Sequence, residues 1–217
     1  MSKDELELDV KDELFWDPKV DSAAIAVSTD DDGRVTLRGT VASLRQRREA
    51  KNAAQRVYGV TGVADELEVR ILNENRRDDA DLRGAVLQAL MLDSVVPSSI
   101  DAKVSDGWVT LSGTADWQFE RDEAEFVAAN VLGVMGVDDQ VGLVALEPTV
   151  DEVEYAIKKA LKRNAKLDAK SLGVETTNGT VTLSGVVSSW SEHDAAVDAA
   201  WAAPGVTSVN DRILVEY

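Results

Sequence analysis

The residues that could support chemistry in this sequence are one histidine, no cysteine and many scattered carboxylates. Without a thiol, the chain forms no disulfide and no thiolate metal site. His193 lies in the segment WSEHD, at the start of a predicted helix. A catalytic triad would present a base and a nucleophile together, and this segment does not match that pattern. We therefore interpret His193 as a solvent-facing helix residue, and we predict that the protein is not an enzyme and needs no cofactor.

Two groups of aspartates could contact a metal cation. The run DDDG at 30–33 is similar to the start of a calcium loop, but the position that would need a glutamate is Val41, so we interpret the run as a charged turn. Asp65, Asp139 and Asp211 occupy equivalent positions on three predicted strands. Two interpretations remain open for them: a cap on a local turn, or contacts to a monovalent cation such as potassium.

The charge balance restricts the partners. The chain has 40 acidic and 23 basic residues and a formal net charge of −17. Such a field repels phosphate backbones, so we expect no nucleic acid partner. The first residues, MSKDELELDVKDELFWD, lack the basic and apolar regions of a secretory signal, and no apolar run reaches the ~20 residues of a membrane span. We therefore expect a cytoplasmic protein that is not transmembrane.

The elements that must position these residues come from a threefold internal repeat. The segment DGRVTLRGT at 32–40 returns as DGWVTLSGT at 106–114 and as NGTVTLSGV at 178–186. Asp-Gly and Asn-Gly pairs favour tight hairpin turns, and the alternating residues that follow predict a strand. The last glycine of each segment is expected to let the chain leave the sheet. The turn and closing glycines are Gly33, Gly39, Gly107, Gly113, Gly179 and Gly185.

Each repeat has the same predicted order of elements. Apolar residues four apart, such as Leu6, Val10 and Leu14, predict a first helix. Two strands joined by the hairpin follow, then a second helix with an alanine-rich face and a final strand. The fold class is therefore α+β, with three tandem α-β-β-α-β units, each a three-stranded sheet with two helices on one face. The predicted repeats are 4–72, 78–145 and 149–217.

These motifs resemble the BON domain, a bacterial osmotic-stress and nodulation module. The resemblance rests on the D/N-G-x-V-T-L-x-G hairpin, the alanine-rich helix and the Gly-Val pairs at 59–60, 133–134 and 205–206, and it covers nearly all of the chain. It implies a non-enzymatic protein of the bacterial stress response. It also implies phospholipid binding, as proposed for envelope members, or potassium binding, as in a cytosolic member.

Aromatic residues are the first candidates for a partner surface. Trp108 alternates with the core residues of its predicted strand, so it should lie on the sheet face opposite the helices. Trp117 and Phe119 are expected in the loop that enters the second helix, where the third repeat has Trp190. Exposed aromatic surface is often covered by a contact. The cover is either a neighbouring repeat or an external protein or lipid surface.

Basic residues of the third repeat are candidates for an anionic headgroup. They recur at a spacing of four with neighbours beside them, which places them on one helical face. The residues are Lys158, Lys159, Lys162, Arg163, Lys166 and Lys170. A solvated helix face explains the same pattern. The leading hypothesis for function is protein or self-association. The alternatives are phospholipid binding and small-cation binding.

The overall charge leads to a first testable prediction. Only a local basic face opposes the repulsion between the chain and an anionic bilayer, so vesicle binding should be weak near neutral pH and lost at moderate salt. Co-sedimentation with anionic vesicles across a salt series measures it. Strong binding at high salt would show that the basic residues of the third repeat do not determine binding.

Overall fold

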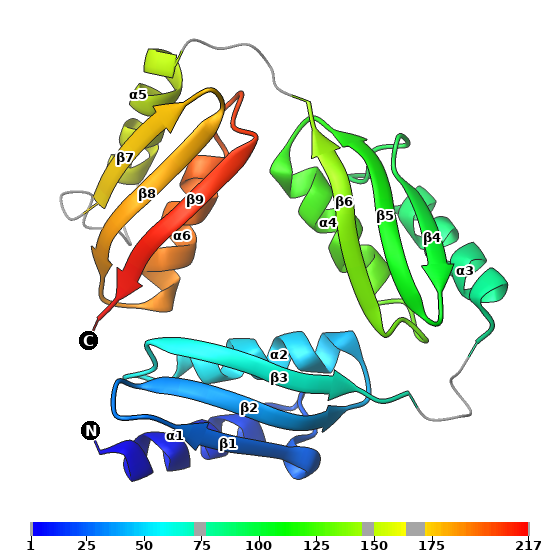
Figure 1. The fold of residues 1–217 in the computed structure, drawn as a ribbon, viewed down its shortest axis with the longest axis vertical. Coiled ribbons are helices and arrows are strands. Elements are labelled where there is room, and N and C mark those ends of the chain that lie inside the picture. The colour runs from blue at the N-terminus through cyan, green and yellow to red at the C-terminus, as the bar shows by residue number, and fades with distance from the viewer. Residues whose placement is uncertain (1, 72–76, 145–149, 164–171, 217) are drawn as a thin grey trace. The chain divides into compact units, whose positions relative to one another are not determined.

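A computed structural model describes residues 2–71, 77–144, 150–163 and 172–216, and the three repeats appear in it as three separate layers of helices against a sheet (Figure 1). The first repeat contains α1 (Lys3–Trp16), a short 3-10 helix (Ser22–Ala24), β1 (Ile25–Thr29), β2 (Arg34–Val41), α2 (Leu44–Arg56) and β3 (Gly62–Val69). The second contains α3 (Asp79–Leu92), β4 (Asp101–Ser105), β5 (Trp108–Ala115), α4 (Gln118–Ala129) and β6 (Gly136–Leu143). The third contains α5 (Val150–Arg163), β7 (Leu172–Thr177), β8 (Thr180–Val187), α6 (Trp190–Trp201) and β9 (Ser208–Val215). The predicted α+β class with three tandem units is confirmed.

Each sheet has its hairpin strands side by side and its last strand on the other side of the central one. The strand orders are β1-β2-β3, β4-β5-β6 and β7-β8-β9. In the first repeat, β1 pairs antiparallel with β2, and β3 pairs parallel with β2. The third repeat has the same pairing. The parallel pair requires a crossover, and α2 and α6 provide it.

The core of the first repeat lies between its sheet and its two helices. Val35 and Leu37 of β2 are fully buried, whereas Arg34 before them and Arg38 after them are exposed, which confirms the predicted alternation. The first helix contributes the predicted four-residue stripe of Leu6, Val10 and Leu14, and the second helix contributes three fully buried alanines, Ala50, Ala53 and Ala54. Both helices cover one face of the sheet (Figure 1).

The hairpin turns follow the prediction in two repeats and differ in the first. Asn178 and Gly179 have φ of 48° and 76°, as a two-residue turn between paired Thr177 and Thr180 requires. In the first repeat the loop is longer, and Asp30 accepts hydrogen bonds at its Oδ1 from the backbone N–H groups of Asp32 at 3.1 Å and Arg34 at 2.8 Å. The DDDG run is therefore a charged turn stabilised by its own first carboxylate.

The closing glycines do not end their strands, contrary to the prediction. Gly39 lies inside β2, at a φ of 128°, and β2 continues to Val41. A Cβ at Gly39 would lie 1.9 Å from the carbonyl oxygen of Ala24 on the segment entering β1. The glycine is required because another backbone passes there, and the strand continues because its partner β3 still pairs with it.

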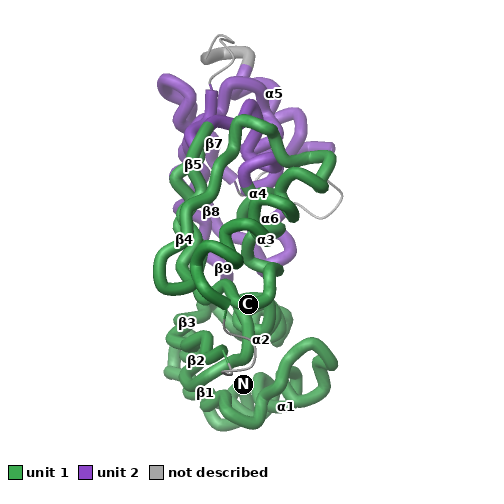
Figure 2. The backbone as a smooth tube through the Cα atoms, turned by 90° about the vertical axis from the view of Figure 1, so that its right-hand side faces the viewer, with its two compact units in different colours: residues 1–113, 122–141 green, residues 114–121, 142–217 purple. Residues whose placement is uncertain are grey.

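By contact density the chain separates into two compact units, residues 1–113 with 122–141 and residues 114–121 with 142–217 (Figure 2). This division cuts through β5 and does not coincide with the repeats. Each repeat nevertheless has its own sheet, and the first and third each have their own cluster of buried apolar residues.

The closing glycines give a prediction with a matched control in the second repeat. Gly113 has a φ of 125°, and a Cβ there would lie 2.2 Å from the carbonyl oxygen of Ser99, so Gly113→Ala should cost about 1–3 kcal/mol or more. Gly84 is an exposed residue of α3 with open space around it, so Gly84→Ala should stabilise by about 0.5–1 kcal/mol. Hydrogen exchange in peptides from residues 78–144 measures both changes. Equal effects of the two substitutions would contradict the role of Gly113.

Candidate binding surfaces

The aspartates on the last strands cap local turns. In each repeat, the carboxylate accepts a hydrogen bond at about 3 Å from the backbone N–H two residues later. The pairs are Asp65 with Leu67 at 3.1 Å, Asp139 with Val141 at 3.0 Å and Asp211 with Ile213 at 3.0 Å. Of the two interpretations of these aspartates, the hydrogen bonds support the turn cap.

In the first and third repeats, a side chain of the second helix contacts this aspartate. The guanidinium Nε of Arg47 donates to Asp65 Oδ2 at 2.9 Å, and its Nη2 donates to the Asp65 carbonyl at 3.3 Å. In the third repeat, His193 Nε2 lies 2.7 Å from Asp211 Oδ2. The His193 side chain is only 13% exposed, so the prediction of a solvent-facing residue was wrong. The histidine occupies the arginine's position because the strand aspartate offers either side chain the same acceptor.

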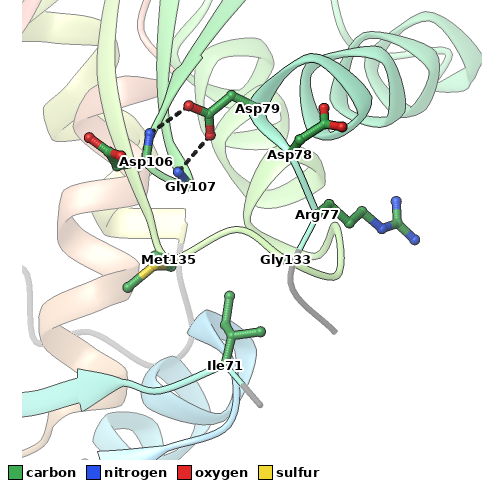
Figure 3. Close-up of a pocket in the computed structure, with 8 residues that line it drawn as sticks. All are labelled: Ile71, Arg77, Asp78, Asp79, Asp106, Gly107, Gly133 and Met135. Atoms are coloured by element: carbon green, nitrogen blue, oxygen red, sulfur yellow. Dashed lines mark hydrogen bonds between the residues drawn. The ribbon is translucent and has the colours of Figure 1, made fainter. Parts of the chain in front are cut away.

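The hairpin turn of the second repeat is also held by a carboxylate. Asp79 of α3 accepts hydrogen bonds from the backbone N–H groups of Asp106 at 2.8 Å and Gly107 at 3.0 Å (Figure 3). Both donors come from the turn, and the backbone N–H of Met135 donates to the Gly107 carbonyl at 2.9 Å. The Asp79 carboxylate therefore ties the first helix of this repeat to its hairpin turn.

Trp108 lies on the sheet face opposite the helices, as its alternation with core residues predicts. Val109 and Leu111 are fully buried, whereas Trp108 is 52% exposed. Its ring lies across Gly136, the first residue of β6. A Cβ on that glycine would lie only 2.2 Å from Trp108 Cζ3. The glycine of the neighbouring strand therefore leaves room for part of the indole, and the rest of the ring is exposed.

The other predicted aromatic residues differ in exposure. Phe119 and Trp190 lie in the first turns of α4 and α6, not in the preceding loops, because those helices begin one position before Phe119 and at Trp190. Phe119 is 59% exposed, but Trp190 packs against the core of the third repeat, with its ring centroid 4.9 Å from that of His193. Trp117 is half-buried, and its backbone N–H donates to Glu120 Oε2 at 3.1 Å. Phe119 and Trp108 are thus the exposed members of the predicted set.

The predicted basic residues form an exposed face on α5. Lys158, Lys159, Lys162 and Arg163 are exposed, and Lys158 pairs with Glu154 one turn earlier. The Lys159 ammonium lies 5.7 Å from the centre of the Tyr155 ring, and Tyr155 is 67% exposed. Lys166 and Lys170 lie outside the described residues.

Four further apolar side chains are highly exposed at positions where the sequence analysis predicted no site. Phe15 and Trp16 end α1 and are 67% and 77% exposed, with ring centroids 5.2 Å apart and edge-on. Met91 and Leu92 end α3 and are 77% and 73% exposed. Both pairs directly follow the last buried leucine of their helix, Leu14 or Leu90. Helical spacing carried this signal, since each pair lies off the buried stripe.

An arginine fixes the end of α1 where Phe15 and Trp16 lie. Arg56, the last residue of α2, donates to Glu13 Oε1 at 2.9 Å and to Asp17 Oδ2 at 2.6 Å. The Asp17 side chain is 6% exposed and also accepts from the backbone N–H of Lys19 at 2.9 Å. The Lys19 hydrogen bond and then the Arg56 guanidinium hold the pKa of Asp17 below its ordinary value.

Comparison with known proteins places this arrangement in a family. The BON domain model matches residues 2–71, 78–145 and 149–217, so the chain belongs to the BON domain family, with three copies. It is 37% identical over 137 residues to osmotically-inducible protein Y of Escherichia coli strain K12, covering 61% of this chain and 68% of that protein.

Two solved structures align with this chain at lower sequence identity. CdsD, a structural protein of the type III secretion system of Chlamydia trachomatis, aligns with 98% of this chain and 92% of its own, at 16% identity and a TM-score of 0.28. The C-terminal domain of CdsD aligns over the whole of both chains at 15% identity and the same TM-score. Within the described residues, no helix combines the length and apolarity that crossing a membrane would require.

The Asp17 contacts give a pH-dependent prediction. Because the folded-state pKa of Asp17 is lowered, its contribution to stability is present above the ordinary value of about 4 and is lost as the pH falls through the folded-state pKa. Asp17→Asn should therefore lower the unfolding midpoint at pH 7, and the difference from wild type should shrink toward pH 3. Denaturant unfolding at both pH values measures it. Asp31→Asn, in the exposed turn, is the matched control, and an effect of equal size there would contradict the prediction.

Proposed function

We propose that this protein is a non-enzymatic binding and assembly protein of the bacterial osmotic-stress response, which acts by associating with protein surfaces, those of its own copies included. The stress role is supported by the three BON domains and by the similarity to osmotically-inducible protein Y. The binding role is supported by the surface of the first two repeats.

The observation that carries the proposal is the repeated apolar end of the first helix. Phe15 and Trp16 in the first repeat and Met91 and Leu92 in the second occupy the same positions after the buried stripe, and all four are more than 60% exposed. A buried aromatic side chain removes about 150–250 Å² from water, so leaving Phe15 and Trp16 exposed, and the apolar Met91 and Leu92 with them, is unfavourable unless a partner covers them. The core of the first repeat is complete without Phe15 and Trp16.

A phospholipid surface is the second candidate, and the exposed basic face of α5 favours it. Lys159, Lys162 and Arg163 beside the exposed Tyr155 combine positive charge with an aromatic ring, as interfacial segments do. The net charge of −17 opposes this binding at long range. A monovalent cation has less support, since the Asp65 and Asp211 carboxylates already accept hydrogen bonds within their repeats.

Site-specific photo-cross-linking in bacterial cells under osmotic stress tests the proposal. A photo-cross-linking residue in place of Trp16 or Met91 should give covalent protein adducts, because the partner covers these side chains. The matched control replaces Lys103, an exposed residue of β4 on the opposite sheet face. Adducts in equal yield at all three positions, or at none, would contradict the proposal. Adducts to lipid alone would favour the second candidate.

A further inference from the structure

The first helices of the first and third repeats, α1 and α5, have the same spacing of buried residues, but their exposed faces differ in charge. In α1, the side facing away from the buried stripe carries Leu8, Asp12, Phe15 and Trp16. The equivalent positions of α5, counted from its own buried residues, carry Tyr155, Lys159, Lys162 and Arg163. Both faces are exposed. Lys11, exposed between Leu8 and Phe15 on α1, is paired with Glu7 one turn earlier, so the unpaired charge of the first face is acidic, whereas the second face is basic with one aromatic ring.

The charges on both faces are available to a partner. Asp9 lies one turn before Asp12, at the edge of the α1 face. Within the described part of the chain, Asp9 and Asp12 are exposed and make no salt bridge, and the same holds for Lys162 and Arg163 of α5. The Lys159 ammonium lies over the ring of Tyr155. Exposed charges of opposite sign beside exposed apolar side chains are the components of an interface with charge complementarity.

Helix electrostatics explain only part of this pattern. Bases in the last turn of a helix interact favourably with its dipole, which accounts for Lys162 and Arg163. The dipole does not account for Lys159, which lies before the last turn, or for the aromatic pair on α1. The last turn of α1 contains no base at all, although the dipole favours one there as well.

We infer that the outer face of α1 in one copy of this chain binds the outer face of α5 in a second copy. This inference rests on the proposed function and names its partner. Asp9 and Asp12 face the α5 bases, and the α5 cations lie against the rings of Phe15 and Trp16, a favourable cation–π arrangement. At physiological salt the Debye length is about 8 Å, so repulsion between two acidic chains is screened while contact pairs remain.

The interface joins two different faces, so each contact leaves one α1 and one α5 unused. Heterologous contacts of this kind close into rings or extend into chains of copies. The average mass of the wild-type protein should therefore rise with concentration and pass beyond that of a dimer.

Two charge-reversal variants test the inference by mixing. Lys159→Glu with Lys162→Glu makes both faces acidic, and Asp9→Lys with Asp12→Lys makes both faces basic. Each variant alone should associate at least about tenfold more weakly than wild type, which corresponds to about 1.4 kcal/mol. An equimolar mixture should regain association, because each acidic face then meets a basic one. Sedimentation velocity at physiological salt measures the mass of each sample. All four substituted positions are exposed, so we expect each variant to fold.

The control variant makes the same change in net charge as Lys159→Glu with Lys162→Glu, but on other surfaces. Lys51→Glu with Lys103→Glu, on exposed positions of α2 and β4, should associate as wild type does. Association that persists in both reversal variants, or a mixture that stays monomeric, would overturn the inference. A monomeric wild type whose Trp16 position still cross-links to another protein would overturn this inference and leave the proposed function standing. No protein adduct and no association would overturn both.

Discussion

The close approach of an alanine-rich helix to a small sheet is the constraint on which each repeat depends. Ala50, Ala53 and Ala54 are fully buried against a sheet whose central strand contributes the fully buried Val35 and Leu37. Small side chains let the second helix lie near the strands, so that one short crossover joins β2 to the parallel strand β3. The first helix then needs only a narrow apolar stripe to complete the core.

That narrow stripe leaves most of the first helix free to vary. Leu6, Val10 and Leu14 face the core, and the opposite side is exposed. Because exposed positions contribute little to folding, the repeats can differ there without losing the fold. Gln88 in the second repeat and Lys159 in the third are equivalent to Asp12 in the first, and all three side chains are exposed. The common frame therefore presents three chemically different surfaces.

Much of the frame could be predicted because it depends on local rules. Alternation and helical spacing identified the buried residues of β2 and α1, and Asn-Gly identified the two-residue turn at Asn178 and Gly179. The errors came where a distant backbone or side chain intervened. Gly39 was expected to end its strand, but it makes room for the carbonyl of Ala24. His193 was expected in solvent, but its Nε2 lies 2.7 Å from Asp211 Oδ2.

The order of residues alone established the threefold repeat, the elements of each unit and the BON family, since these follow from glycine positions and apolar periodicity within a short stretch of chain. It also located the basic residues of α5. The tertiary structure decided which side chains stay exposed once the core is filled. Trp190 and Phe119 have similar places in the sequence, yet the first packs into its repeat and the second does not. The tertiary structure also fixes the end of α1 that carries Phe15 and Trp16, because Arg56 of α2 holds it through hydrogen bonds between residues far apart in the chain.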